Sequence, residues 1–365
     1  MLLQNLNVSN LREISEKYNI PFIDSMLISL NTLGAKSDLP FLRVRFRIKV
    51  LNYEKEFYYA ICLNTTKTPF LLQGVNIKLG DETVAIVKNL ENDIAELSYF
   101  RKNGNVLVLN LNRRTKCLNC EFCGARFQTE RFSVRLTDKK SIELYFSFLE
   151  EMYGKLFKKL EEIAINTGLF LSEERVLKHL EDVSETAKTF GFKGEIKYIG
   201  SEISEKGIER IAKKTEKFSY YLTLETFENR ILMNNTKSLM DVKKAKKILK
   251  LCKENGIPAT ILYVLGLEPL KIFKHGIREI SPFLTRFPVI NIFQVYDISQ
   301  NKIRHPEATE IEYFLSARKF VEKLFEEREL RPRLWENYRG LWYTSFSSEV
   351  IKNEEIKLQT FTRAH

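Results

Sequence analysis

A short segment of the chain carries three cysteines, Cys117, Cys120 and Cys123, within seven residues. Thiolates at this spacing on one loop can reach three corners of an iron–sulfur cube, and closely spaced cysteines are typical of cluster ligation. The fourth iron would then lack a thiolate from the same loop, and an open coordination position on a metal is commonly where chemistry occurs. The segment therefore predicts a metal centre with one open position.

Other cysteine chemistries fit this segment less well. A structural zinc site takes four ligands, usually as two Cys or His pairs, but the chain has no second CxxC and its four histidines lie far downstream. A bacterial ferredoxin continues with C-x3-C-P, whereas Gly124 and Ala125 follow Cys123. Disulfides are not expected, because five cysteines in 365 residues are sparse and no secretory signal pattern opens the chain.

Composition predicts a globular protein with a large core. Hydrophobic residues make up 44% of the 365 residues and charged residues 29%, which are ordinary values. No apolar run approaches the length of a membrane span, so we expect no membrane partner and a reducing, cytoplasmic location. The net charge of +11 would serve binding to nucleic-acid phosphates. Much of the excess, however, lies in helical patterns such as residues 155–159 and 243–247, which indicate solvated outer faces.

After residue 104 the chain alternates between strand and helix patterns. The predicted strands are 105–111, 162–166, 194–200, 218–225, 259–265 and 289–296, and the predicted helices are 140–160, 173–190, 204–215, 238–255, 270–282 and 310–327. Six βα units call for parallel strands with right-handed crossovers. Polar or small residues end almost every strand, which favours a (β/α)6 partial TIM barrel over a doubly wound sheet with one switch point.

The first hundred residues have a different texture and predict a small α+β domain over residues 1–100. A helix is expected over 10–19, and short strands with a period of two follow it. Arg43, Arg45 and Arg47 share one face of the first strand. This arginine row would suit an anionic peptide, a nucleotide or RNA, or it would be the wet face of a half-buried sheet.

A cysteine triplet in the loop after the first strand of a six-unit β/α region resembles the radical SAM superfamily. The resemblance covers residues 104–330 and leaves 331–365 as a tail expected to pack on the barrel. It implies a [4Fe–4S] cluster on three cysteines, with S-adenosylmethionine (SAM) bound to the fourth iron. Reductive cleavage of SAM then gives a 5′-deoxyadenosyl radical that abstracts a substrate hydrogen. The family's usual spacing is CxxxCxxC, so the CxxCxxC of this chain is one residue shorter.

The resemblance also assigns roles to residues. Cys117, Cys120 and Cys123 are the expected cluster ligands. Phe122 matches the aromatic residue that packs by the adenine in the family, and residues 166–168 replace the Gly-Gly-Glu segment that holds the SAM amino group. The candidate contacts to SAM or substrate at the strand ends are Thr167, Gly168, Ser201, Glu202, Glu225, Gly266 and Gln294, with Glu268 as a further carboxylate.

The leading hypothesis is a radical SAM enzyme that acts on a small molecule or a peptide and receives electrons from a reductant such as flavodoxin or ferredoxin. An RNA-modifying radical SAM enzyme is one alternative, because the positive charge would serve RNA. A non-enzymatic iron–sulfur or zinc-binding protein is the other. Cys62 and Cys252 lie in apolar patterns and are expected in the core. The segment 331–343, rich in Arg and Trp, is expected either to pack across the barrel or to form a wall of the substrate site.

Overall fold

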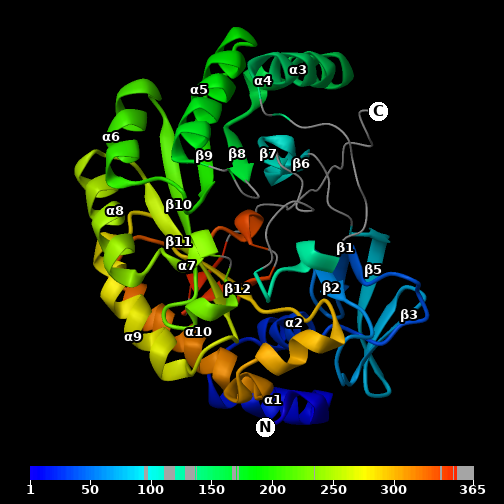
Figure 1. The fold of residues 1–365 in the computed structure, drawn as a ribbon. Coiled ribbons are helices and arrows are strands. Elements are labelled where there is room, and N and C mark those ends of the chain that lie inside the picture. The colour runs from blue at the N-terminus through cyan, green and yellow to red at the C-terminus, as the bar shows by residue number, and fades with distance from the viewer. Residues whose placement is uncertain are drawn as a thin grey trace.

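One curled sheet of seven strands forms the larger part of the molecule (Figure 1). The computed structural model describes residues 1–93, 98–110, 120–127, 136, 138–166, 170, 172–233, 235–337, 339–347 and 349–351. The strand order is β12-β11-β10-β9-β8-β7-β6. Strands β7 to β12 are parallel, and the edge strand β6 is antiparallel to β7. The strands are β6 (Ser98–Arg101), β7 (Val106–Asn110), β8 (Glu162–Asn166), β9 (Glu195–Gly200), β10 (Phe218–Glu225), β11 (Ala259–Leu265) and β12 (Val289–Ile292).

Helices between these strands cover the outer face of the curled sheet (Figure 1). They are α3 (Lys139–Tyr153), α4 (Leu156–Lys159), α5 (Glu173–Thr189), α6 (Glu205–Lys214), α8 (Val242–Glu254) and α9 (Leu270–Ile280). The short helix α7 (Asn235–Ser238) lies in the connection after β10, and α10 (Ile311–Phe325) follows β12 and packs against α9. The predicted mixed α/β architecture with a partly closed barrel is confirmed. The predicted helix 140–160 is divided into α3 and α4, because Gly154 and Lys155 both adopt positive φ. The predicted last strand ends at Ile292 instead of residue 296.

Short 3₁₀ helices connect the larger elements. They are η1 (Leu3–Asn5), η2 (Lys102–Gly104), η4 (Gly124–Phe127), η5 (Arg230–Leu232), η6 (Ser281–Phe283), η7 (Ile298–Ile303), η8 (Pro306–Thr309) and η9 (Leu334–Glu336). Among the helices of the described residues, not one combines the length and the apolar character needed to cross a membrane.

A second, antiparallel sheet belongs to the N-terminal part of the chain, in the order β2-β1-β5-β4-β3. The elements of this part are α1 (Val8–Lys17), α2 (Phe22–Leu33), β1 (Arg43–Val50), β2 (Glu56–Cys62), β3 (Phe70–Gln73), β4 (Asn76–Leu79) and β5 (Glu82–Asn92). Helix α1 begins earlier than the predicted 10–19, because Asn7 and Asn10 form a capping box at its N-terminus. The chain passes from this sheet to the barrel sheet between β5 and β6.

Helix α2 joins the two parts of the molecule. It contacts β2 of the N-terminal sheet and both β12 and α10 of the barrel. Asp24 of α2 is completely buried, forms an ion pair with Arg318 of α10 and accepts the backbone N–H of Thr344 at 2.9 Å. Buried side chains of both sheets form one continuous apolar core. The N-terminal part therefore packs as an integral layer against the barrel.

The arginine row of β1 lies in this buried environment. Arg43 and Arg45 are each only 4% exposed. Arg43 forms an ion pair with Asp93, and the Nε of Arg45 donates to Glu91 at 2.8 Å. The prediction of a solvated arginine face is therefore wrong, and the two guanidinium groups already have carboxylate partners. A buried Arg is tolerated only when its charge is paired, as it is here.

The C-terminal segment, residues 334–337 and 339, contacts the two edge strands of the barrel sheet. The Asn337 amide donates to the carbonyl of Ile290 at 2.7 Å, and the N–H of Ile292 donates to the carbonyl of Arg339 at 2.8 Å. At the other edge, Arg101 of β6 donates to the carbonyl of Glu336 at 2.7 Å. Two short strands follow this segment: β13 (Ser345–Phe346) and β14 (Glu349–Val350). The C-terminal segment thus bridges β12 and β6.

Candidate active site

A cavity of about 240 Å³ lies on the inner face of the curled sheet. Alternate residues of each parallel strand face it, as expected of pleated strands. The lining residues nearest the carboxyl ends of the strands are Asn110, Asn166, Thr223, Glu225, Val264 and Asn291. Most of them are polar, so the carboxyl ends of the strands form a polar rim. Barrel enzymes place their sites at this end of the barrel.

The cysteine loop, residues 120–127, lies at this rim. Phe122 and Cys123 line the cavity. Cys120 is 3% exposed and belongs to an apolar cluster. The other buried members of the cluster are Phe122, Leu232, Met233, Val264, Leu267, Phe293 and Val295. The N–H of Cys123 donates to the carbonyl of Cys120 at 3.0 Å, so one tight turn connects the two cysteines. Cys117 lies outside the described residues.

The remaining cysteines are core residues, as the sequence predicts. Burial raises the pKa of the Cys62 thiol to about 11 and that of the Cys252 thiol to about 12. Both therefore stay protonated at neutral pH, whereas metal ligation needs a thiolate. Within the described ranges, which omit Cys117, no group of three or more His, Cys, Asp or Glu side chains lies close enough to hold a metal ion.

Gly124 allows the cysteine loop to pack closely on Tyr296. A Cβ added at Gly124 would overlap the Tyr296 ring, so only glycine fits. Tyr296 also lines the cavity, and its hydroxyl accepts a hydrogen bond from Arg339 at 3.1 Å. The Arg43 guanidinium lies 5.4 Å from the centre of the same ring. The ring thus contacts the cysteine loop, the C-terminal segment and the N-terminal sheet.

Glu202 lines the cavity and has one carboxylate oxygen to which no described residue donates. Its Oε2 accepts the hydroxyl of Tyr198 at 2.5 Å and the N–H of Ser201 at 2.7 Å. Its Oε1 is buried, and no described residue donates to it. A buried acceptor without a donor is costly, so this oxygen is suited to a ligand that brings a donor. Ser201 is buried but does not line the cavity.

Glu225 lines the cavity in a strained backbone conformation. Its φ is +68°, and the pairing of β10 with β11 is irregular at this residue. Its carboxylate pairs with Lys237 at 2.9 Å. Arg230 donates to the carbonyls of Leu224 and Thr226, at 2.6 and 2.8 Å, and so holds the backbone on both sides of Glu225. A strained backbone conformation persists only where many surrounding contacts hold it in place, and such conformations are common at functional sites.

Two of the predicted strand-end residues after β11 have structural roles. Glu268 is buried, and its carboxylate accepts the backbone N–H groups of Phe227, Glu228 and Asn229 at 2.5–2.8 Å. It therefore shapes the loop after β10 and does not face the cavity. Gly266 has a φ of +117°, which favours glycine, and its carbonyl accepts the N–H of His305 at 2.8 Å; it does not line the cavity either.

Gln294 also lies away from the cavity, in the contact between the barrel and the N-terminal part. Its amide nitrogen donates to Asn31 at 2.9 Å and to the carbonyl of Ala60 at 2.8 Å, and its oxygen accepts from Arg43 at 3.3 Å. Gln294 is not among the residues that line the cavity, and both polar atoms of its amide already have protein partners, so a role as a cofactor contact stays a prediction without support from this geometry. The predicted contacts Thr167 and Gly168 lie outside the described residues.

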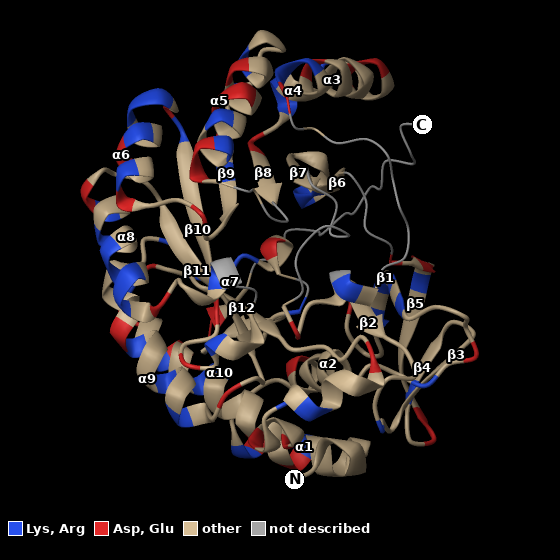
Figure 2. Ribbon diagram, in the orientation of Figure 1, with Lys and Arg blue, Asp and Glu red and all other residues tan. Residues whose placement is uncertain are grey.

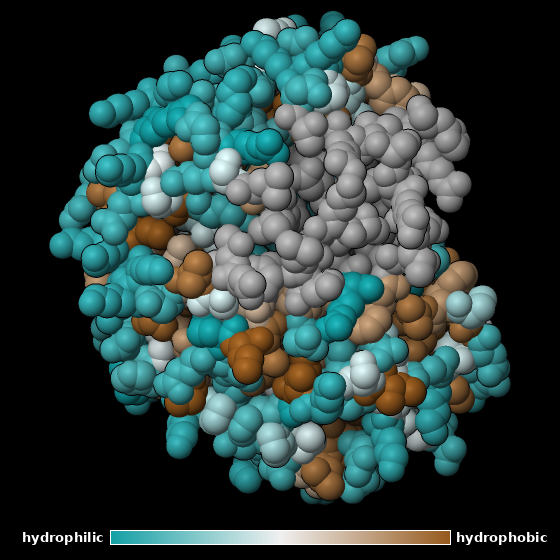
Figure 3. Space-filling model, in the orientation of Figure 1, coloured by the Kyte–Doolittle hydropathy of each residue, from teal (hydrophilic) through white to brown (hydrophobic). Residues whose placement is uncertain are grey.

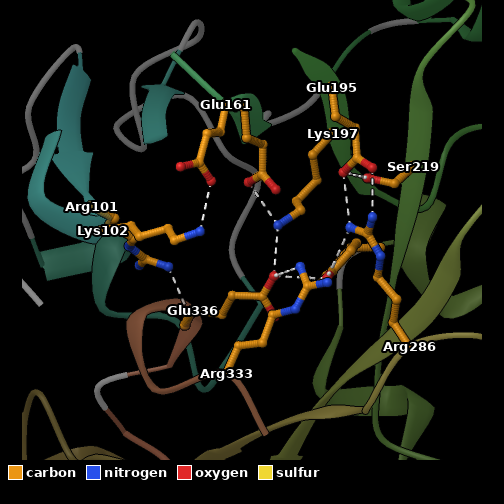
Figure 4. Close-up of polar contacts among 11 residues, drawn as sticks. Arg101, Lys102, Glu161, Glu195, Lys197, Ser219, Arg286, Arg333 and Glu336 are labelled. Atoms are coloured by element: carbon orange, nitrogen blue, oxygen red, sulfur yellow. Dashed lines mark hydrogen bonds and ion pairs between the residues drawn. The ribbon is translucent and has the colours of Figure 1, made fainter. Parts of the chain in front are cut away.

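A buried cluster of charged and aromatic side chains, the charged floor, lines the cavity toward the ends where the strands begin. Figure 4 shows Lys197 and Glu336 of this cluster and their polar contacts. The charged floor consists of Glu162, Lys197, Tyr221, Trp335 and Glu336. The Lys197 ammonium pairs with Glu162 at 2.7 Å and Glu336 at 2.8 Å, and the Tyr221 hydroxyl donates to Glu336 at 2.8 Å. Burial disfavours the charged lysine, but the two carboxylates outweigh it and hold the pKa of Lys197 above its ordinary value. Lys197 is therefore an ammonium at all physiological pH.

Trp335 separates this cavity from a second one of about 420 Å³ at the opposite end of the barrel, and it lines both. The Lys197 ammonium lies 4.9 Å from the centre of the indole. Trp342 instead packs in the core, with its ring centre 5.0 Å from that of Phe287. Only Trp335 of the two tryptophans thus contributes to the cavity wall.

Sequence reasoning did not find the charged floor or the supporting role of Arg230. Glu162 and Lys197 lie within predicted barrel strands, and a charge inside an apolar strand pattern was the available signal. Glu336 comes from the segment 331–343, where its partner could not be identified, because 139 residues separate it from Lys197. Four of the predicted residues line the same cavity: Phe122, Cys123, Glu202 and Glu225. Cys120 lies in the apolar cluster that contains Phe122.

No family model and no curated protein matches the chain. Among solved structures, it is similar to SuiB of Streptococcus suis bound to S-adenosylmethionine, with 15% identity and a TM-score of 0.41 over 62% of this chain and 50% of that one. It is also similar to coproporphyrinogen III oxidase (HemN) of Escherichia coli, described as a radical SAM enzyme, with 14% identity and a TM-score of 0.40 over 60% and 52%. HydG, a maturase of the [FeFe]-hydrogenase, gives 15% identity and a TM-score of 0.39 over 56% and 51%. The chain spans about half the length of these structures.

Proposed function

We propose that the chain is a radical SAM enzyme whose cluster is held by Cys117, Cys120 and Cys123. The observation that carries the proposal is the position of the cysteine loop, which meets a cavity at the polar carboxyl ends of parallel strands. Cys120 and Cys123 lie among apolar side chains there, and such surroundings keep water away from a cluster. Cys117 precedes Cys120 by three residues and would supply the third thiolate.

The described residues fit a cofactor with an adenosyl group and an amino acid end. Phe122 offers a ring at the cavity, Glu202 an acceptor oxygen, and Glu225 with Lys237 a pair of opposite charges. We assign adenine packing to Phe122 and contacts to donor groups of SAM to the two carboxylates. Thr167 and Gly168 are retained as proposed contacts of the amino group.

When bound, the cluster and SAM supply a radical. With one electron from an external reductant, such as a flavodoxin or a ferredoxin, they would supply a 5′-deoxyadenosyl radical and methionine from SAM, and the radical would be available to take a hydrogen atom from the substrate. The protein's part is to orient the substrate and to exclude solvent that would quench the radical. The charged floor, which includes Trp335, lies at the inner end of the cavity and would help to exclude solvent there.

The substrate is proposed to be a small molecule or a peptide. Lys and Arg are interspersed with Asp and Glu over the outer helices α5, α6 and α9, whereas the charged residues of α8 are nearly all Lys (Figure 2). The same helices present a mostly hydrophilic surface (Figure 3). Among the described residues, part of the excess positive charge therefore lies on solvated helix faces on the other side of the sheet from the cavity. Charge in that position gives no specific support to RNA as the substrate.

Anaerobic reconstitution tests the proposal. The protein should take up about four irons and four sulfides per chain, and the dithionite-reduced protein should form 5′-deoxyadenosine from SAM. Cys120→Ala and Cys123→Ala should abolish both, whereas the matched controls Cys62→Ala and Cys252→Ala should keep them. Tight zinc binding without iron, or a cluster with no cleavage of SAM, would show a non-enzymatic metal protein instead.

A further inference from the structure

The backbone of Glu121, which lies between Cys120 and Phe122, is held from two directions by distant parts of the chain. The N–H of Glu121 donates to the carbonyl of Leu232 in η5 at 2.8 Å. The carbonyl of Glu121 accepts from the side-chain amide of Gln300 in η7 at 2.7 Å. Both polar groups of the Glu121 backbone are therefore occupied, in the middle of the cysteine loop.

Gln300 is well placed to hold the loop. It is 3% exposed, and its amide oxygen accepts the N–H of Tyr296 at 2.8 Å while its amide nitrogen donates to Glu121. One side chain thus connects the cysteine loop to the segment after β12. The same segment carries the Tyr296 ring, against which Gly124 packs. Two separate contacts, one polar and one steric, therefore fix the loop on the same support.

This support is in turn attached to the N-terminal part. The Asn301 amide donates to the carbonyl of Thr65 at 3.0 Å, and the Thr65 hydroxyl donates to the carbonyl of Val295 at 2.6 Å. Arg304, which follows η7, donates to the carbonyl of Thr32 in α2 at 2.7 Å. Hydrogen bonds therefore attach the segment 300–304 to α2 and to the loop after β2. Gln300 of this segment in turn binds the cysteine loop.

We propose that Gln300 is a positioning residue for the cluster, because it fixes the cysteine loop on the segment after β12. The inference rests on the proposed function, since it requires that the cysteine loop hold a cluster. The physical reason is that a loop fixed in the ligating conformation has less conformational entropy to lose when the thiolates bind iron. Loss of the Gln300 bond should therefore weaken iron retention.

Gln300→Glu tests this with nearly the same shape. The carboxylate can still accept from the N–H of Tyr296, but it cannot donate to the carbonyl of Glu121. Gln300→Ala removes both bonds. Gln294→Ala is the matched control, because Gln294 is a buried glutamine with similar hydrogen bonds to main chain and side chains but does not touch the cysteine loop. Thermal unfolding of the iron-free proteins shows that each variant folds.

The readouts are the rate of iron loss to a ferrous chelator and the EPR spectrum of the dithionite-reduced cluster. Both Gln300 variants should lose iron about tenfold faster or more, as expected for one lost hydrogen bond, with a shifted EPR signal. Gln294→Ala should lower the melting temperature and keep the wild-type rate and spectrum. If both Gln300 variants keep the wild-type rate of iron loss and the wild-type EPR spectrum, this inference is wrong, whereas the proposed function still stands. If the wild-type protein binds no cluster, the proposed function fails and this inference fails with it.

Discussion

Replacing Lys197 by Met should destabilise the protein strongly at neutral pH and much less in mild acid. The variant keeps the apolar stem but removes the cation that lies 2.7 Å from Glu162 and 2.8 Å from Glu336. All three side chains are almost completely buried. Breaking a buried pair by removing one partner typically costs about 3–5 kcal/mol, because the remaining charge is uncompensated. That is a large fraction of the roughly 5–15 kcal/mol by which a native protein is stable.

The pH dependence gives the sharper test. Without Lys197, burial and mutual repulsion should raise the folded-state pKa of the two carboxylates above the unfolded value. A folded state that binds protons more tightly gains stability as pH falls. The loss caused by Lys197→Met should therefore shrink between about pH 7.5 and about pH 5.5, and adding Glu336→Gln should recover part of it.

Urea unfolding of the iron-free protein, followed by circular dichroism, measures these differences. Lys139→Met is the matched control, because Lys139 forms a 2.9 Å ion pair with Glu185 on the surface. It should leave the unfolding midpoint unchanged. A loss for Lys197→Met below about 1 kcal/mol, the size of an exposed pair, would refute the description of the charged floor as a buried, mutually dependent cluster. An equal loss at both pH values would refute it as well.

Three further outcomes are expected. Burial lowers the pKa of His179 to about 4. Between about pH 6.5 and pH 4 the unfolded chain therefore binds a proton that the folded chain does not, and the free energy of unfolding should fall by up to about 3 kcal/mol. The same fall in the His179→Leu variant would contradict this. Gly124→Ala should lower the iron content after reconstitution because the added methyl group overlaps Tyr296, whereas Gly256→Ala, whose Cβ meets open space, should not. Deleting residues 1–93 should prevent cooperative folding, because Arg318 loses Asp24; a truncated protein that melts cooperatively and binds iron would disprove it.

The barrel could be predicted from the sequence because its strands are short apolar runs separated by amphipathic helices. Helix α2 could not, because it is buried on nearly all sides and has no polar face to give it a helical period. Its polar residues are buried, and two of them, Asp24 and Asn31, find partners in distant segments, whereas the Ser29 hydroxyl donates to the carbonyl of Ser25 within the helix. The helix therefore looks irregular until the surrounding layers are known.

The site residues divide in the same way. The sequence pattern around a polar residue at a strand end is the same whether the side chain lines the cavity or binds another part of the protein. Glu202 and Glu225 line the cavity, whereas Glu268 binds a backbone loop and Gln294 binds the N-terminal part. The difference depends on which way each side chain leaves its strand end and on partners far along the chain. Neither can be inferred from local pattern.

The C-terminal segment has a consequence for the behaviour of shortened chains. Strand β12 reads Val-Ile-Asn-Ile and lies at the edge of its sheet, where unpaired backbone groups would invite strands of other molecules. Asn337 and Arg339 occupy the carbonyl of Ile290 and the N–H of Ile292, and so they cover that edge. A chain that ends before residue 334 would expose the apolar edge strand β12, and we expect such a chain to aggregate through this edge.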